Sequence, residues 1–337
     1  MRISIVILLF IPFLLKAQTA IIKPLSKGVN SIGSELNFIR VDEKTAYYSS
    51  SNMEQEHYES LIYKTIFIDG IWQKGTYFNL GDAQSVANIT FFNDSIYFVV
   101  YDNLGNCNIV YRDNIKPVTK LINGQYINYP RAQNTQPHFV NHNNQKVMYF
   151  VSNREGGFGG MDIWLSIIDK DGNFGSPINA GPNVNSRFDE ITPFFNNTEG
   201  ALYFSSNRSE SIGGFDIYNA IGHTNIWEDV KNIAFLNTEF DEMYLSFYTG
   251  NKGYISSNRT GALYKEQEYC CNDIFSFKIL PKKEIKEESG AVFLKYLPLK
   301  LYFHNDEPDC CTKSTTTAKS YKDAYISYFK MEDEYAL

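Results

Sequence analysis

Two acidic pairs in the sequence could cleave a glycosidic bond, Asp189-Glu190 and Asp241-Glu242. Glycosidases commonly use two carboxylates about 5–9 Å apart, which flank the bond. Both pairs, however, stand at the same place in a repeated phrase, so we interpret them as residues that link one repeat to the next. Catalysis by these carboxylates is kept as the alternative.

Two further groups resemble metal sites only in part. His138 and His142 are four residues apart, a spacing that shares one face of a helix, but their surroundings predict strands and turns, and zinc needs more ligands. The run Asp169-Lys-Asp-Gly-Asn173 begins like a calcium loop but lacks the glycine and the glutamate required further on, so a hairpin turn is expected. No Gly-x-Ser-x-Gly elbow and no phosphate-binding glycine loop occurs. We therefore predict no catalytic, cofactor-binding or metal-binding residue and no cofactor.

The elements that would position such residues follow a repeat of about fifty residues. Five tyrosines mark it: Tyr47, Tyr97, Tyr149, Tyr203 and Tyr254. The clearest copies are MYFVSNREGGFGGMDIW (148–164), LYFSSNRSESIGGFDIY (202–218) and GYISSNRTGALYKEQEYCCNDIF (253–275). A period of this size predicts a repeat architecture.

Each repeat alternates short apolar strands with turns rich in Gly, Asn and Asp. In the third repeat we expect strands at 137–140, 147–152, 162–168 and 176–180. Four antiparallel strands in about fifty residues make one blade of a β-propeller. The fold class is therefore all-β, a five-bladed propeller of four-stranded blades.

A linker phrase without a preceding blade predicts how the ring closes. The phrase PINAGPNVNSRFDE (177–190) joins two blades, and residues 24–35 carry a similar phrase near the N-terminus. If residues 21–25 form the outer strand of the last blade, around Tyr254, the two ends of the domain meet and no sheet edge is left open.

The residues that recur in each blade are interpreted as structural. The glycines are expected to supply backbone angles that other residues avoid, and each aspartate to accept hydrogen bonds either from turn amides or from a repeat arginine. Besides the five tyrosines, these structural residues are Asn153, Arg154, Gly159, Gly160, Asp162, Asn207, Arg208, Gly213, Gly214, Asp216, Asn258, Arg259 and Asp273.

The N-terminus and the overall charge limit where the protein acts. A basic residue, an apolar run and Ala17 predict a secretory signal over residues 1–17, and no later segment is long and apolar enough for a membrane helix. A net charge of −7 argues against nucleic acid as a partner. Five cysteines occur, Cys107 and the pairs Cys270-Cys271 and Cys310-Cys311, and a disulfide between the pairs or free thiols are both open.

The repeat phrases resemble the WD40-like (PD40), TolB-type propeller repeat of bacterial envelope proteins. The match is carried by Ser-Asn-Arg at 152–154, 206–208 and 257–259 and by the Gly-Gly-x-Asp motifs at 159–162 and 213–216; the copies around Tyr47 and Tyr97 have diverged. The phrase LPLKLYFHNDEP (297–308) resembles the opening of an OmpA-like domain. The later helix that grips peptidoglycan in that family has no counterpart here, so the resemblance does not carry peptidoglycan binding over to any residue of this sequence.

Together these features give an expected organisation and two functional hypotheses. We expect a signal peptide (1–17), the propeller (18–280), a charged linker (281–290) and an incomplete, α/β OmpA-like segment (291–337). The resemblance implies export to the periplasm or outer membrane and a non-catalytic scaffold that binds envelope or secretion-machinery proteins. The alternative is a glycan hydrolase or lyase with its site in the central channel.

Overall fold

The computed structural model describes residues 18–51, 59–81, 85–102, 105–113, 119–122, 126–263 and 271–281. The chain divides into two compact units, residues 1–282 and 283–337, and every described residue belongs to the first. The predicted signal peptide and OmpA-like segment lie outside the described residues and stay predictions. Among the described residues, no helix has the length and apolar character that a bilayer span requires.

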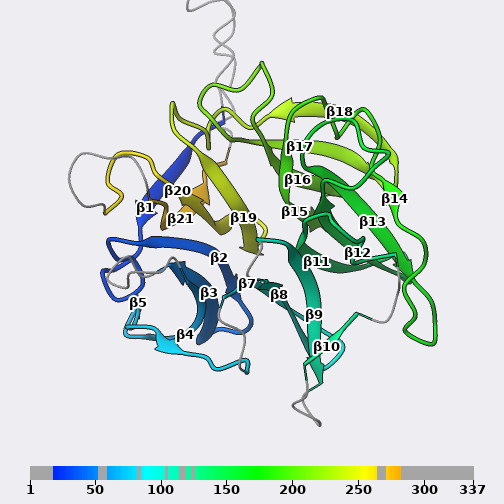
Figure 1. Cartoon of the computed structure of the whole chain (residues 1–337). Helices are drawn as coiled ribbons and strands as arrows, with labels where there is room; N and C mark the ends of the chain where they lie inside the picture. The colour runs from blue at the N-terminus through cyan, green and yellow to red at the C-terminus, as the bar shows by residue number, and fades with distance from the viewer. Residues whose placement is uncertain are drawn as a thin grey trace, which may run out of the picture. The chain divides into compact units, whose positions relative to one another are not determined.

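Five antiparallel sheets stand around a common centre, as the sequence predicts (Figure 1). From the inner strand outward, blade 1 holds β2 (Ser34–Arg40), β3 (Thr45–Ser51), β4 (Ser60–Ile68) and β5 (Ile71–Trp72), with β6 (Thr76–Tyr77) also paired to β4. Blade 2 holds β7 (Val86–Phe92), β8 (Ser95–Tyr101), β9 (Cys107–Asp113) and β10 (Thr119–Leu121). Blade 3 holds β11 (Asn134–His142), β12 (Gln145–Ser152), β13 (Asp162–Ile168) and β14 (Ile178–Asn179). Blade 4 holds β15 (Glu190–Asn196), β16 (Ala201–Ser206), β17 (Asp216–His223) and β18 (Ile226–Asn232). Blade 5 holds β19 (Glu242–Thr249), β20 (Lys252–Ser257), β21 (Asp273–Ile279) and β1 (Ala20–Pro24).

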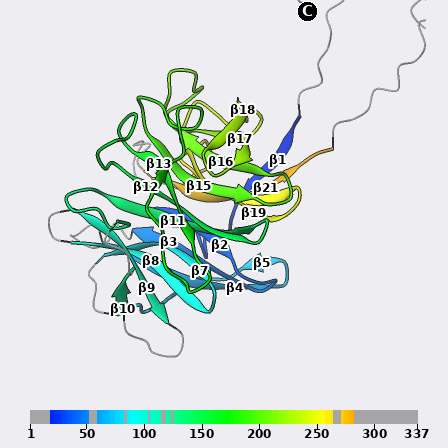
Figure 2. The same ribbon diagram turned by 90° about the vertical axis from the view of Figure 1, so that its right-hand side faces the viewer.

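The ring closes where the sequence places its seam. Strand β1 pairs antiparallel with β21, so that Ile22 lies opposite Phe277, and it forms the outer strand of the last blade (Figure 2). The inner strands contact one another in the order β2, β7, β11, β15, β19 and back to β2. The five-bladed propeller closed by an N-terminal strand is therefore confirmed.

The core lies between the blades. The described part of the chain has five clusters of buried apolar residues, and each fills the space between two neighbouring blades. A strand in the middle of a blade is covered on both faces, which is why β12 and β16 are almost entirely buried. All five ladder tyrosines lie on the second strand of their blades and pack into these clusters.

Candidate functional site: the central channel

A ring of five residues in a left-handed backbone conformation surrounds the propeller axis. Each inner strand contributes one, two or three positions after the strand begins, with φ between 53° and 57°: Asn37, Asn88, Gln136, Thr192 and Tyr244. Such angles are uncommon for residues other than glycine, and a β-branched residue such as threonine rarely adopts them. Since strained backbone persists only where its surroundings enforce it, this ring points to the channel as a candidate functional site.

A β-bulge at each of the five positions explains the conformation. The pairing of every inner strand with the next strand shifts across the left-handed residue, for example between Leu36 and Ile39 in blade 1 and between Met243 and Ser246 in blade 5. A bulge redirects side chains, and here all five left-handed residues line the channel. The residue that follows each of them is buried and apolar: Phe38, Ile89, Pro137, Pro193 and Leu245. The bulge therefore presents a polar side chain to the channel, and the apolar residue that follows is buried, with Pro137, Pro193 and Leu245 also lining the channel.

Hydrogen bonds between blades hold this ring together. Asn37 donates to the carbonyl of Ile89 at 3.0 Å, and Ser246 donates to the carbonyl of Phe38 at 3.0 Å. Asn88 Nδ2 donates to Thr135 Oγ1 at 3.1 Å. These contacts link blade 1 to blade 2, blade 5 to blade 1, and blade 2 to blade 3.

Gln136 in blade 3 makes hydrogen bonds to the neighbouring blade 4 and to blade 5, which is not a neighbour. Its Oε1 accepts from the amide of Thr192 in blade 4 at 2.7 Å, and its Nε2 donates to the hydroxyl of Tyr244 in blade 5 at 3.1 Å. The second bond joins blade 3 to blade 5 across the channel. The remaining cavity is about 30 Å³, roughly the volume of one water molecule.

The channel lining carries two titratable side chains and, within the described residues, no aspartate or glutamate. Burial lowers the pKa of His138 to about 4, so this imidazole is neutral at pH 7. Burial raises the pKa of Tyr244, so its phenol stays protonated. Two buried atoms of the lining, His138 Nε2 and Asn88 Oδ1, have no hydrogen-bond partner among the described residues. The lining thus offers a proton acceptor, a proton donor and unused polar groups.

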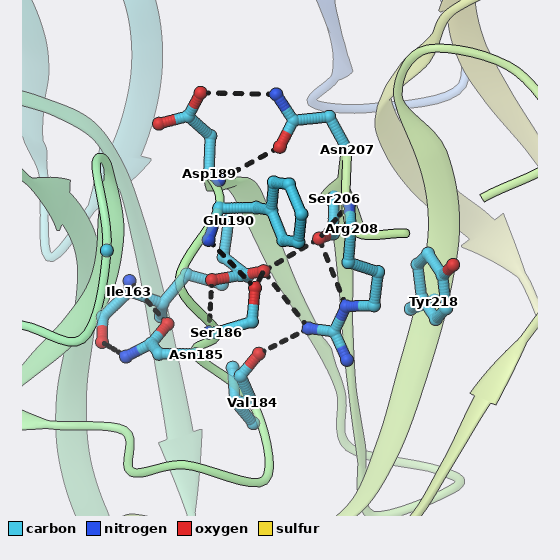
Figure 3. Close-up of polar contacts among 12 residues, drawn as sticks. Ile163, Val184, Asn185, Ser186, Asp189, Glu190, Ser206, Asn207, Arg208 and Tyr218 are labelled. Atoms are coloured by element: carbon cyan, nitrogen blue, oxygen red, sulfur yellow. Dashed lines mark hydrogen bonds and ion pairs between the residues drawn. The ribbon is translucent and has the colours of Figure 1, made fainter. Parts of the chain in front are cut away.

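The glutamates of the acidic pairs lie elsewhere. Each begins an inner strand and is held by hydroxyl groups and by the repeat arginine, an arrangement that we call a clasp. Figure 3 shows the one around Glu190, whose carboxylate accepts from the Ser186 amide and hydroxyl, from Ser206 Oγ and from Arg208 Nη2 at 3.2 Å. Arg208 Nη2 also donates to the Val184 carbonyl at 2.6 Å. The carboxylate is fully buried, so Glu190 is a structural residue of the blade, as the repeat predicts.

The clasp recurs in other blades with small changes. Glu242 bonds Thr238, Ser257 and Arg259 in the same way, and Glu35 bonds Ser31 and Ser50. In blade 3 the acid is replaced by Asn134, which accepts from Ser152 and Arg154. The arginine of the repeat therefore pairs with the first residue of the inner strand and with linker carbonyls, and not with the repeat aspartate.

The aspartates that begin the third strands accept turn amides, which decides between the two partners left open above. Asp162 accepts from the amides of Phe158 and Gly159, and Asp216 does the same with Ile212 and Gly213. The third copy differs: Asp273 accepts from the Leu263 amide, its Oδ1 has no partner among the described residues, and burial raises its pKa to about 7.

The aspartates of the acidic pairs, Asp189 and Asp241, form hydrogen bonds with the repeat asparagines and with the turn before the third strand. Asp189 Oδ1 accepts from the Met161 amide at 2.8 Å, and the Asp189 amide donates to Asn207 Oδ1 at 2.9 Å (Figure 3). Asp241 and Asn258 repeat the arrangement. In blade 3, Asn153 accepts from the Gln133 amide.

The paired glycines have a different role from the one expected. Gly159, Gly160, Gly213 and Gly214 do not have positive φ, so the expected left-handed angles are wrong for these four. A Cβ on Gly159 would lie 2.4 Å from the carbonyl oxygen of Phe188, and one on Gly213 would lie 2.0 Å from that of Phe240. Glycine is required because the next linker passes directly against the backbone.

The remaining sequence candidates form no metal site. His142 lies at the exposed end of β11 beside Asn197, while His138 faces the channel, and Asp169 closes a turn through Asn173. Among the described residues no group of three or more His, Cys, Asp or Glu could hold a metal ion. Cys107 is a buried free thiol and Cys271 is disulfide-bonded; Cys270, Cys310 and Cys311 lie outside the described residues, so the pairing stays a prediction.

No protein-family model matches the sequence, and no curated protein is significantly similar to it. Solved structures share the fold. The endo-arabinase from Bacteroides thetaiotaomicron is 14% identical with a TM-score of 0.51, over 77% of this chain and 98% of that one. A thermostable family-43 glycoside hydrolase is 12% identical (TM-score 0.48, 76% and 91% covered), and a TolB from Agrobacterium tumefaciens is 14% identical (TM-score 0.41, 72% and 73% covered). At these identities the likeness shows the β-propeller fold.

The hypothesis of a non-catalytic scaffold is contradicted, because a solved structure that shares this fold is an endo-arabinase. The hypothesis failed because it was built on what recurs in every blade. Four different residue types occupy the five ring positions, and they belong to no motif. One signal was available: in three of the blades the channel residue stands two positions after a glutamate (Glu35, Glu190 and Glu242).

Proposed function

We propose that the protein is a glycan-cleaving enzyme whose sugar chain is bound at the central channel. The observation that carries the proposal is the polar channel ring, in which a common left-handed position holds different side chains in different blades. A sugar presents many hydroxyls, and the amides of Asn37, Asn88 and Gln136 offer donors and acceptors for them. The fold shared with an endo-arabinase supports a glycan as the substrate class.

The titratable residues of the lining favour cleavage by elimination. In a uronate, a base removes the C5 proton next to the carboxylate, a C4=C5 double bond forms, and the C4–O bond breaks as the leaving oxygen takes up a proton. His138 has the acceptor state and an unpartnered Nε2, which suits the base. Tyr244 keeps its proton, which suits the acid.

The present cavity, of about 30 Å³, is too small for a sugar ring, and we propose that the hydrogen bond between Gln136 and Tyr244 opens when a sugar binds. Hydrolysis by two carboxylates is the second candidate, favoured by the hydrolase that shares the fold. It would need carboxylates from outside the described channel lining.

Turnover assays separate these chemistries. The purified chain is incubated with polygalacturonate and, in parallel, with the neutral glycan arabinan, and new reducing ends and the ultraviolet absorbance of an unsaturated product are followed. We expect both signals with polygalacturonate and their loss in His138→Gln, with Tyr203→Phe, which lies outside the channel, as the control. Reducing ends without absorbance would establish hydrolysis. Cleavage of neither glycan, or unchanged rates in His138→Gln, would contradict the proposed site.

We also propose that the protein is exported and acts in the cell envelope. This proposal is supported by the signal-like composition of residues 1–17 and by the repeat phrases that resemble TolB-type proteins. An exported enzyme would meet glycans outside the cytoplasm. Envelope or secretion-machinery partners remain a sequence-based prediction.

A further inference from the structure

A second cavity lies at the seam of the ring, between blade 5 and blade 1. We call it the seam pocket; its walls include Ser26, Arg40, Phe67, Trp72, Tyr248 and Tyr254. Its volume is about 380 Å³, within the range of small-molecule sites and far larger than the channel cavity. It shares no lining residue with the channel, so it is a separate site.

Aromatic rings form the floor and one side of the seam pocket. Trp72 Nε1 donates to the hydroxyl of Tyr254 at 3.1 Å, which fixes both rings, and the ring of Phe67 packs 5.0 Å from that of Trp72. Tyr248 lies 5.2 Å from Tyr254 and is 36% exposed, so part of this residue is accessible to a ligand. Fixed aromatic rings offer large contact area at little entropic cost, and the C–H face of a sugar ring packs on such a surface.

The guanidinium of Arg40 gives the seam pocket a positive charge. Arg40 lies 4.6 Å from the centre of the Tyr248 ring and 5.6 Å from that of Trp72. Its Nε and Nη2 donate to the carbonyl oxygens of Asp42 and Glu43, at 2.9 and 2.6 Å. Among the described residues that line the pocket there is no aspartate or glutamate. An uncompensated guanidinium of fixed direction is suited to a carboxylate.

We infer that the seam pocket binds a sugar that carries a carboxylate, a uronic acid unit of a glycan. The choice of a sugar rests on the proposed function, whereas the preference for an anion rests on Arg40 alone. The sugar ring stacks on Tyr248, and its carboxylate pairs with the Arg40 guanidinium. Hydroxyls of Ser26 and Tyr254 on the walls complete a polar rim.

Calorimetric titration of the full chain with trigalacturonate, and with neutral maltotriose as the matched probe, tests the inference. We expect trigalacturonate to bind more tightly, and Arg40→Gln to weaken it by about tenfold or more, the size of a lost charge-assisted hydrogen bond. Tyr248→Ala removes the stacking face and should weaken both sugars. The matched control is Arg187→Gln, because Arg187 also stacks on a ring, 4.9 Å from Phe188, but lines none of these cavities. Thermal melts show whether the Arg40 variant is folded.

Each outcome decides for or against the seam pocket separately from the proposed function. Equal affinity for the two sugars, no detectable binding, or equal losses in Arg40→Gln and Arg187→Gln would overturn the inference. If the protein cleaves polygalacturonate but Arg40→Gln does not change the affinity for trigalacturonate, the inference about the seam pocket is wrong and the proposed function stands. Arg40-dependent binding without any turnover would instead uphold the pocket and contradict the proposed function.

Discussion

Gln136 donates a hydrogen bond to Tyr244 across the central channel, from blade 3 to blade 5, with 3.1 Å between Nε2 and the hydroxyl oxygen. Both residues are left-handed and both stand at a bulge of their inner strands. Blades 3 and 5 are not neighbours, so this bond is not part of the packing between adjacent blades. It joins two side chains that line the channel, and the first prediction concerns its removal.

Tyr244→Phe should destabilise the propeller, because it leaves the Gln136 amide without its acceptor. A polar group left unsatisfied in this way costs about 1–3 kcal/mol in the free energy of unfolding. Chemical denaturation measures the change, and Tyr77→Phe, whose exposed ring lies on β6, is the control. Equal stability of the two variants would show that the cross-channel bond contributes nothing.

Glu242→Ala should lower the free energy of unfolding much more than a substitution at the surface does. The substitution leaves the guanidinium of Arg259, whose side chain is 9% exposed, without its carboxylate at 3.1 Å. Breaking a buried pair costs about 3–5 kcal/mol. The control is Asp229→Ala at the exposed pair with Lys231, where a loss of about 0–1 kcal/mol is expected. Similar urea midpoints for both variants would refute the structural role of the clasp.

Gly159→Ala tests the revised explanation of the paired glycines. The added methyl group would meet the carbonyl oxygens of Phe188 and Ser186, both at 2.4 Å, so the linker must move. Overpacking of this kind costs about 1–3 kcal/mol. Gly250→Ala is the matched control, because its Cβ meets nothing within 4 Å and its φ is not positive. A loss of stability in the control but not in Gly159→Ala would contradict the close approach.

The architecture could be predicted from the sequence because it depends on features that recur. The ladder tyrosines mark the second strand of each blade, and the linker phrase at residues 24–35 locates the seam. The channel ring could not be predicted in this way. Its five bulges are defined by backbone pairing, and their side chains range from threonine to tyrosine, so no shared residue type marks them. The role of Gly159 was also hidden, since it depends on a carbonyl from a different blade linker.

Lowering the pH should reduce the free energy of unfolding of the native protein more than that of His138→Gln. The pKa of His138 lies near 4 in the folded protein, against 6.5 for an ordinary imidazole. Between these values the unfolded chain binds a proton that the folded protein does not, so the free energy of unfolding falls as the pH falls from about 6.5 to about 4. The partly buried ring makes this loss about 1–3 kcal/mol, and His138→Gln should not show it. Denaturation curves at several pH values measure both proteins, with His142→Gln at the exposed end of the same strand as the control. The same acid dependence in the native protein and in His138→Gln would mean that the channel imidazole is not held neutral, and it would remove the basis for assigning it as the base.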